Sequence, residues 1–519
     1  MDVRAEKVSA GLQEEEEEGV EVLLPLQNVR YDPGSKSKAG KMEEPEEKCS
    51  SDANLTHSRL NLYLSIFVVN LLYMCTGQCY VWTSPTLPYL LSKESFLPTT
   101  PAQGSVIASV FVFGGVLGAL LTRPLADSLG RRWTLGLCQL SVLASWALLG
   151  LTADVNIIYI ARLVQGLSTG INFSVGPLYT AEISDDTVRG ALNSIPLFSR
   201  SCGYVFVYSF GPYVTYHQLI VIAAIGPVVG LLLTPLIAES PHYQVARGKR
   251  TKAIKTVQWL RGGMSYPAAE KEVDAIQEYY NQTATQKKSI KDLVATIGNI
   301  RALYLSAGLL GVQQLCGVTV ILLYTEPIFQ MTGTSISASM SAIMFGVTLM
   351  VSAIIVPPFV KRFGFIKPMI LSSLGCAIFV GLLGVFFFLQ SLKVDISTLN
   401  WLPVTSTVLY TVSYSIGIGT LPWAVMGEIF PANTKSLAAG ILTSFNFLLG
   451  FLTAVLFVEV NEWLGVCWSF WMYAVFSLLA APFTKYLLPD TQGLSLDQIQ
   501  RLVNQPWNTK WSRKPDLVI

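Results

Sequence analysis

Long apolar runs separated by short polar connections fill most of the chain. Runs of about twenty apolar residues, the length that crosses a bilayer as an α-helix, begin near positions 62, 104, 133, 156, 190, 217, 303, 337, 367, 402, 437 and 465. They form two groups of six around a polar stretch at 239–300. The pattern therefore predicts an all-α membrane protein with twelve transmembrane helices.

The composition supports this fold class and excludes others. Hydrophobic residues make up 51% of the 519 positions and charged residues only 13%, whereas soluble domains carry about a quarter charged residues. The net charge is +2 and no basic patch is interleaved with aromatic residues, so we expect no nucleic-acid partner. No metal-ligand spacing, cofactor motif or catalytic set occurs. We therefore expect no cofactor, no metal and no enzyme activity.

The first 55 residues differ in kind from the rest. They include five consecutive glutamates at 14–18 and almost no aromatic residues, which predicts a disordered, acidic cytoplasmic tail. We expect the remaining chain to divide into a six-helix bundle at 60–238, a cytoplasmic linker with short helices at 239–300, a second six-helix bundle at 301–488 and a cytoplasmic tail at 489–519.

Basic residues gather on one side of the predicted membrane. The connections on the other side carry only Lys93 and Lys393. Because cytoplasmic loops carry an excess of Lys and Arg, the bias places the middle stretch and both termini in the cytoplasm. The basic residues of that stretch are Arg247, Lys249, Arg250, Lys252, Lys255, Arg261, Lys271, Lys287, Lys288 and Lys291.

The second half repeats the charge pattern of the first. Glu182 and Arg189 follow span four, seven residues apart. Glu428 and Lys435 follow span ten at the same spacing. This recurrence predicts a duplicated six-helix unit. Such charges can bridge the two halves while the protein is open outward and must part when it opens inward; solvated helix-end charges are the alternative. The same cytoplasmic rim includes, at the ends of spans two and six, Asp127, Arg131, Arg132 and Glu239.

Six motifs in order resemble the signatures of one family. They are "ADSLGRR", "YTAEI…RG", "AESPHY", "QQLCG", "LPWAVMGEIFP" and "PDTQGLSLDQIQ". Together they resemble the sugar-porter branch of the major facilitator superfamily, and the chain is most similar in look to insect facilitated trehalose and glucose transporters. The resemblance covers about 60–500. It implies two pseudo-symmetric six-helix bundles that rock around a central sugar site.

The resemblance also implies the residues of that site. Gln313 and Gln314 of span seven and Asn446 of span eleven would hydrogen-bond to sugar hydroxyls, because an amide both donates and accepts. Trp423, in the broken tenth helix, would stack on an apolar sugar face. Tyr324 would gate the outer half of span seven. The chain also departs from the family pattern, with Thr319, Leu197 and Leu349 at positions where the family carries an asparagine or a glutamine.

Arg200 is a further unusual feature. It lies about eleven residues into span five, roughly 16 Å deep and near the middle of the membrane. An arginine there must face water, a partner or a ligand, and we expect no Asp or Glu in the interior of the twelve spans to pair with it. Two interpretations stay open. Either Arg200 hydrogen-bonds to carbonyls at a helix break, or it binds an anionic ligand.

These observations predict a facilitative transporter, or uniporter, for a neutral sugar such as trehalose or a hexose. Residues 62–83 contain no carboxylate, so a proton gradient has no evident carrier. The alternatives are a transporter-like nutrient sensor without flux and a carrier of an anionic small molecule that uses Arg200. We expect a monomer in the plasma membrane, with the lipid bilayer and a small sugar as its partners.

Overall fold

The computed structural model describes residues 59–284, 290–334, 336–489 and 496–504. All of them belong to one compact unit that spans 53–519. The predicted tail at 1–55 lies outside the described residues, as does most of the segment after 489. Within the described residues the secondary structure is helical, without strands.

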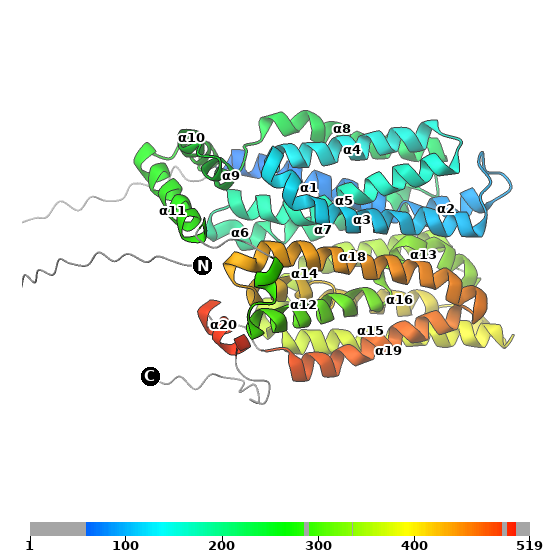
Figure 1. Ribbon diagram of the computed structural model, residues 1–519. Helices are drawn as coiled ribbons and strands as arrows, with labels where there is room; N and C mark the ends of the chain where they lie inside the picture. Colours follow the sequence, from blue (N-terminus) through cyan, green and yellow to red (C-terminus); the bar gives the residue numbers. More distant parts are fainter. Residues whose placement is uncertain (1–58, 285–289, 335, 490–495, 505–519) are drawn as a thin grey trace, which may run out of the picture. The chain divides into compact units, whose positions relative to one another are not determined.

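The first half contains eight α-helices (Figure 1). They are α1 (Leu60–Val81), α2 (Thr83–Leu91), α3 (Pro101–Leu129), α4 (Arg131–Leu151), α5 (Val155–Ile183), α6 (Asp186–Leu192), α7 (Ile195–Phe210) and α8 (Tyr216–Leu233). The middle stretch forms η1 (Thr234–Leu236), α9 (Pro241–Ala246), α10 (Arg250–Leu260), α11 (Tyr266–Ala284) and η2 (Ile290–Leu293).

The second half has a similar arrangement. Its helices are α12 (Ile297–Leu315), α13 (Val318–Thr332), α14 (Ala338–Phe363), α15 (Ile366–Ser391), η3 (Ser397–Leu399), α16 (Leu402–Ile416), α17 (Leu421–Ile429), α18 (Ala432–Trp463), α19 (Val466–Leu487) and α20 (Leu496–Asn504). The two halves meet mainly through α3 against α18, α7 against α14 and α2 against α13.

Each of the twelve predicted spans coincides with a helix or a pair of helices. Ten segments of the described chain are long and apolar enough to cross a membrane. The other two predicted spans correspond to α5, which has 29 residues and buries several polar side chains, and α7, which has 16 residues. The helices therefore agree with the predicted twelve-helix architecture.

Local sequence signals start several of these helices. Thr100 and Gln103 form a capping box at α3, and Thr215 and Gln218 form another at α8, each with the side chains and backbone amides bonded reciprocally. Gly317 separates α12 from α13 with a φ of 89°, a conformation that glycine adopts without strain. Span seven is thus two helices joined at a glycine.

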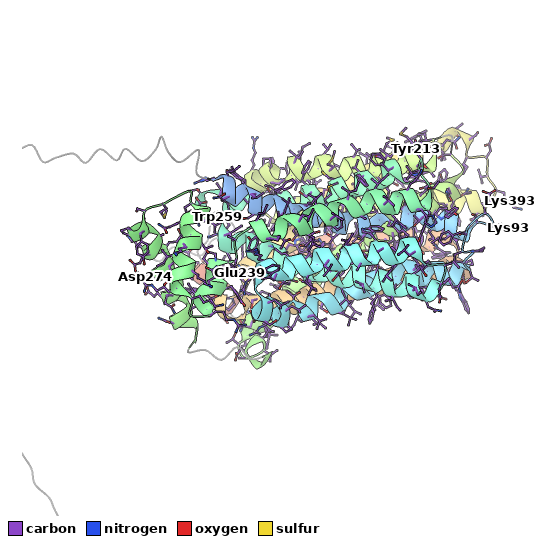
Figure 2. All side chains as sticks on the ribbon, turned by 90° about the horizontal axis from the view of Figure 1, so that it is seen from above. Lys93, Tyr213, Glu239, Trp259, Asp274 and Lys393 are labelled. Carbon is purple, nitrogen blue, oxygen red and sulfur yellow. The ribbon has the colours of Figure 1, made fainter. Side chains whose placement is uncertain are left out.

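The labelled residues distinguish the two ends of the helix bundle (Figure 2). Figure 2 shows Lys93, Tyr213 and Lys393 at one end, which we call the α2 end, and Glu239, Trp259 and Asp274 at the other, which we call the α9 end. The start of α1 lies at the α9 end, because the Asn61 side chain donates to the Trp259 carbonyl at 3.0 Å. The basic helix α10 lies at the same end.

The segment after 489 contains an element that the sequence analysis did not anticipate. Helix α20 packs against α12 and α17 and buries Leu502 and Val503. The Arg301 guanidinium donates to the Val503 carbonyl at 3.0 Å, and the Gly298 amide donates to the Asn504 side chain at 2.9 Å. This part of the expected tail is therefore a helix docked on the second half.

Candidate functional site

One cavity lies between the two halves. Its walls come from α1, α5 and α7 of the first half and from α12, α13, α14, α16, α17 and α18 of the second. Six of the seven side chains that the sequence predicts to bind substrate line it: Arg200, Gln313, Gln314, Thr319, Trp423 and Asn446. The helices thus bring together residues separated by as many as 246 positions.

Amide and hydroxyl groups form a hydrogen-bond network along one wall. Gln314 Nε2 donates to the side-chain oxygen Oδ1 of Asn446 at 2.9 Å, and Gln314 Oε1 accepts from the Thr319 hydroxyl at 2.6 Å. Asn446 donates in turn to Gln313 Oε1 at 3.1 Å. Tyr80, from the opposite half, hydrogen-bonds to Thr319 at 2.9 Å. The network fixes the orientation of each amide.

Gln313 also makes structural contacts that the sequence analysis did not predict. Its Nε2 donates to the carbonyls of Ile418 at 3.0 Å and Gly419 at 2.9 Å, in the break between α16 and α17. The Ser372 hydroxyl accepts from the Ile418 amide there at 2.9 Å. Backbone groups freed inside a membrane need such partners. The broken tenth span is therefore held by a side chain of span seven.

Aromatic rings form the other wall. Trp423 lines the cavity half-buried, and its ring centroid lies 6.4 Å from that of Phe173. Phe173 also packs edge-on against Phe447 at 5.5 Å. Phe173 and Tyr80 were not among the predicted site residues, because an aromatic residue in an apolar run carries no sequence signal for the face it occupies.

Tyr324 stands apart from the other predicted site residues. It does not line the cavity in this structure. Its side chain is buried with a ring centroid 5.4 Å from Phe457, and its backbone (φ −121°, ψ 23°) interrupts α13. The residue thus lies at a kink beside the cavity, and substrate contact would need α13 to move.

Arg200 extends from α7 into the cavity. Its guanidinium carbon lies 5.0 Å from the Phe173 ring centroid and 5.9 Å from that of Tyr204. Its Nε is buried without a hydrogen-bond acceptor. In the described part of the chain no carbonyl at a helix break accepts a hydrogen bond from it, in contrast to the first of the two sequence interpretations.

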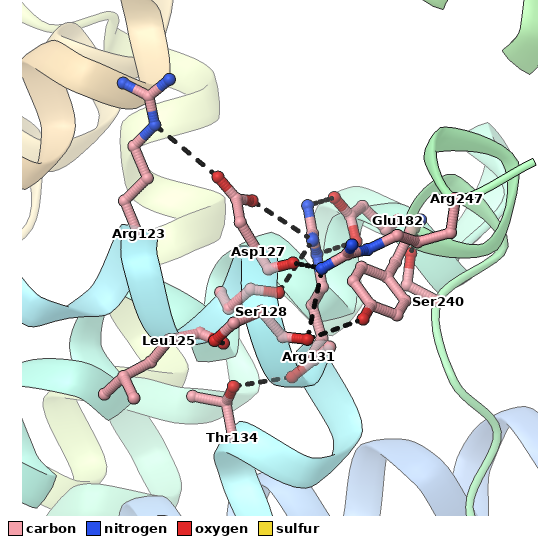
Figure 3. Close-up of polar contacts among 12 residues, drawn as sticks. Arg123, Leu125, Asp127, Ser128, Arg131, Thr134, Glu182, Ser240 and Arg247 are labelled. Carbon is pink, nitrogen blue, oxygen red and sulfur yellow. Dashed lines mark hydrogen bonds and ion pairs between the residues drawn. The ribbon is translucent and has the colours of Figure 1, made fainter.

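The predicted charge network at the α9 end is well formed within the first half (Figure 3). Arg131 pairs with Glu182 through two bonds of 2.9 Å and lies 3.7 Å from Asp127. Glu239 accepts from the backbone amides of Arg131 at 2.8 Å and Arg132 at 3.2 Å. Helix α9 closes over this network.

Burial shifts the titration of two groups at this rim. It raises the pKa of the Glu239 carboxyl, although three backbone amides that bond to it act in the opposite direction. Burial also lowers the pKa of His242, against the effect of the nearby Glu182 carboxylate. Both neutral forms are therefore favoured relative to the free side chains.

The remaining predicted network residues flank the rim. Arg189 donates to the Ser184 carbonyl at 3.1 Å. Glu428 lies in the last turn of α17, and Lys435 lies in the first turn of α18. The partners described for Arg131 all belong to the first half, so bridging between the halves stays a prediction.

One sequence expectation is wrong. Glu326 lies inside the spanning segment Ile297–Thr332, where no acid was expected. Its side chain is largely buried and accepts from the Ser339 hydroxyl at 3.1 Å. The error arose because span seven was counted as about twenty residues from 303, whereas α12 and α13 together continue to 332.

The two halves are joined tightly at the α2 end. Thr83 donates to the Leu323 carbonyl at 3.0 Å, and the Glu326 amide donates to the Ser84 hydroxyl at 2.9 Å. Tyr208 donates to the Leu322 carbonyl at 3.0 Å. These contacts connect α2 and α7 with α13, so the cavity is closed toward the α2 end.

Comparison with known proteins agrees with this geometry. The family model of the sugar (and other) transporters matches residues 44–503. A facilitated trehalose transporter, Tret1, of Culex quinquefasciatus is 30% identical over 461 residues, which cover 88% of this chain and 87% of the relative. The Tret1 of Aedes aegypti is 29% identical over 441 residues, and that match covers 84% of this chain but only 54% of the relative.

Solved structures support the fold. A partially occluded, inward-open structure of the xylose transporter XylE from E. coli superposes with a TM-score of 0.70 at 20% identity, covering 84% of this chain and 99% of that one. XylE bound to 6-bromo-6-deoxy-D-glucose gives a TM-score of 0.69, also at 20% identity, and covers 85% of this chain and 99% of its own. The chain therefore belongs to the sugar (and other) transporter family and is a multi-pass membrane transporter with the major facilitator fold.

Proposed function

We propose that the protein carries a neutral sugar, trehalose or a hexose, across the plasma membrane by facilitated diffusion. The observation that carries the proposal is the cavity between the halves, where Gln314 and Asn446 face Trp423. Amides suit sugar hydroxyls and an indole suits the apolar face of a sugar ring. The Tret1 relatives are named as facilitated trehalose transporters, which supports trehalose as the first substrate to test.

The charge distribution supports a cytoplasmic α9 end. Helix α10 and its flanks carry many basic residues there, and cytoplasmic segments are enriched in Lys and Arg. Both termini would then be cytoplasmic, and the closed α2 end would face outward. The structure would represent an inward-facing state of a monomer in the bilayer, in which bundles at 60–238 and 301–488 rock about the cavity.

Transport would require the network to exchange partners. A bound sugar would replace bonds between Gln314, Asn446 and Thr319 with bonds to its hydroxyls. Opening of the α2 end would break the contacts of α13 with α2 and α7, and Tyr324 would move with α13. At the α9 end, Glu182, Arg189, Glu428 and Lys435 would approach one another as that end closes.

Counterflow in proteoliposomes tests this function. Labelled trehalose, glucose and fructose would be offered to vesicles loaded with the same unlabelled sugar, with and without a pH gradient. We expect counterflow of at least one sugar, unchanged by the gradient. Trp423→Ala should reduce it about tenfold, and Trp463→Ala, which alters a ring that is 79% exposed at the end of α18, should not.

The same vesicles distinguish the sensor alternative. A nutrient sensor without flux would bind sugar, seen as quenching of tryptophan fluorescence, yet give no counterflow. Dependence on an imposed pH gradient would contradict uniport and would direct attention to Glu326.

A further inference from the structure

The position of Arg200 is fixed by close helix packing. The carbonyl oxygen of Arg200 would lie 2.3 Å from a Cβ placed on Gly77 of α1, and a Cβ on Gly203 would lie 2.1 Å from the Met74 carbonyl oxygen. Neither position accepts a larger residue without separating α1 from α7. The contact therefore sets the rotation of α7 and directs the Arg200 side chain to the cavity.

The surroundings of the guanidinium are aromatic and apolar. The guanidinium lies over the aromatic rings of Phe173 and Tyr204. The same cavity is lined by Leu197 and Leu349. Of the cavity-lining residues that the structure describes, Arg200 alone carries a formal charge. Placing a cation there costs free energy unless an anion or a hydrogen-bond acceptor pairs with it, and no residue that the structure describes accepts a hydrogen bond from Arg200.

The hydrogen-bonding groups of the cavity are unequally engaged. Gln313, Gln314 and Asn446 donate to one another or to the carbonyls of the helix break. In the described structure, the Arg200 nitrogens make neither a hydrogen bond nor an ion pair. Nε is also buried, so water does not replace the missing acceptor. Among the donors that are free for a ligand, which include the hydroxyls of Tyr204, Ser352 and Tyr414, the Arg200 guanidinium alone is cationic in the described structure.

We propose that this cavity binds sugars that carry a carboxylate, and binds them more tightly than the corresponding neutral sugars. Arg200 forms a paired hydrogen bond with the carboxylate, for which a planar guanidinium is suited, while the ring packs against Trp423. A single cation also matches a single negative charge better than a phosphate dianion. The proposal rests on the proposed function, since it assigns the substrate class of the same site.

Glucose and glucuronate provide the test, because they differ only at C6. The full-length protein in proteoliposomes would be assayed for uptake of each sugar. We expect the kcat/KM of uptake to be at least tenfold higher for glucuronate. Arg200→Gln should reduce the ratio of the kcat/KM for glucuronate to that for glucose at least tenfold. Arg200→Lys keeps the charge but loses the paired geometry, so it should give an intermediate value.

Lys93→Gln is the matched control. It also removes one positive charge, but from an exposed position at the α2 end, remote from the α9 end (Figure 2). It should leave the uptake of both sugars unchanged. If Lys93→Gln reduced glucuronate uptake as much as Arg200→Gln does, the effect would be one of total charge and the proposal would be overturned.

The outcomes separate the two proposals. Glucose uptake without glucuronate uptake, unchanged in Arg200→Gln, would overturn the carboxylate site and keep sugar transport. Loss of both activities in Arg200→Gln, with an unchanged melting temperature, would also overturn it. If neither sugar nor trehalose moved through the wild-type protein, the proposed function itself would fail. Glucuronate uptake that is stimulated by a positive interior potential and lost in Arg200→Gln would support the inference.

Discussion

Two arginines within the first half of the bundle have opposite surroundings. Arg162 of α5 is fully buried, and its nitrogens donate to the carbonyls of Cys79 at 2.6 Å and Ile107 at 3.3 Å and to the Gln165 side chain at 2.7 Å. Arg200 of α7 is partly exposed in the cavity and donates to no described residue. Both lie over aromatic rings, at 4.4 Å for Arg162 and 5.0 Å for Arg200.

The difference shows one residue type whose donors are largely engaged by the protein in one place and, under our proposal, available for recognition in another. Arg162 connects α5 to α1 and α3 through its Nε and Nη1, which donate hydrogen bonds once the chain has folded, whereas its Nη2 is buried without an acceptor. The nitrogens of Arg200 donate no hydrogen bond within the described structure, and we propose that they serve a bound carboxylate. Both arginines contact aromatic rings, so ring contact does not distinguish them. They differ in whether their N–H groups donate hydrogen bonds to the protein.

The largest expected effect concerns two tryptophans, one in the enclosed core and one at the cavity wall. Trp82 is fully buried below Arg162, and Trp82→Ala should lower the free energy of unfolding by about 3–5 kcal/mol, as deletion of a large buried ring does. Trp423→Ala, at the cavity, should cost about 1 kcal/mol. Thermal unfolding in detergent measures both, and equal losses would contradict the division between enclosed core and cavity wall.

The arginines themselves give the next largest difference. Arg162→Met should lower the free energy of unfolding by about 2–4 kcal/mol, because buried hydrogen bonds to a charged group contribute about 1.5–3 kcal/mol each and partly overlap. Arg200→Met should change stability by less than about 1 kcal/mol. The comparison fails if Arg200→Met lowers the melting temperature as much as Arg162→Met.

Gln313 provides a smaller effect of the same kind. Gln313→Leu leaves the carbonyls of Ile418 and Gly419 without this donor, so the free energy of unfolding should fall by about 1–3 kcal/mol. Ser352→Ala, on the same cavity, serves as the control and should change stability by less than about 0.5 kcal/mol. Hydrogen exchange should also increase at 417–420 in Gln313→Leu. Unchanged exchange there would show that the break holds without Gln313.

The smallest effect concerns His242, whose buried imidazole is neutral near pH 7 and can gain a proton on acidification. Burial lowers its pKa below the usual 6.5, so on acidification the unfolded chain binds the proton first. Stability that is present above about pH 6.5 should therefore decline as the pH falls through and below that value. His242→Phe should weaken this decline in melting curves recorded between about pH 5 and about pH 8. A parallel decline in both proteins would assign it to other groups.

Much of the fold could be predicted from the sequence. Apolar runs predicted the twelve spans, because each is long enough to cross a bilayer, and the two glycines and two prolines at 419–431 indicated that the tenth span is broken. The family, the transporter rather than enzyme function and the fold are confirmed by the comparisons. The roles of individual site residues stay predictions.

What the sequence could not give are contacts that depend on three dimensions. Nothing in "QQLCG" shows that Gln313 donates to a helix break about a hundred positions away. A length of about twenty residues for span seven ended the predicted span before Glu326. The nine residues of α20 are too few to cross a membrane, so they were assigned to the tail. Helix rotation also decided that Phe173 faces the cavity, which an apolar run does not encode.

The bond between Gln313 and the carbonyls of the helix break has a mechanical consequence. A side chain that lines the cavity, and that we propose contacts the substrate, also holds together the two parts of the broken tenth span. A solute that accepted a hydrogen bond from this amide would compete with the carbonyls of Ile418 and Gly419. Binding in the cavity would then loosen the break between α16 and α17 directly, before either bundle moves.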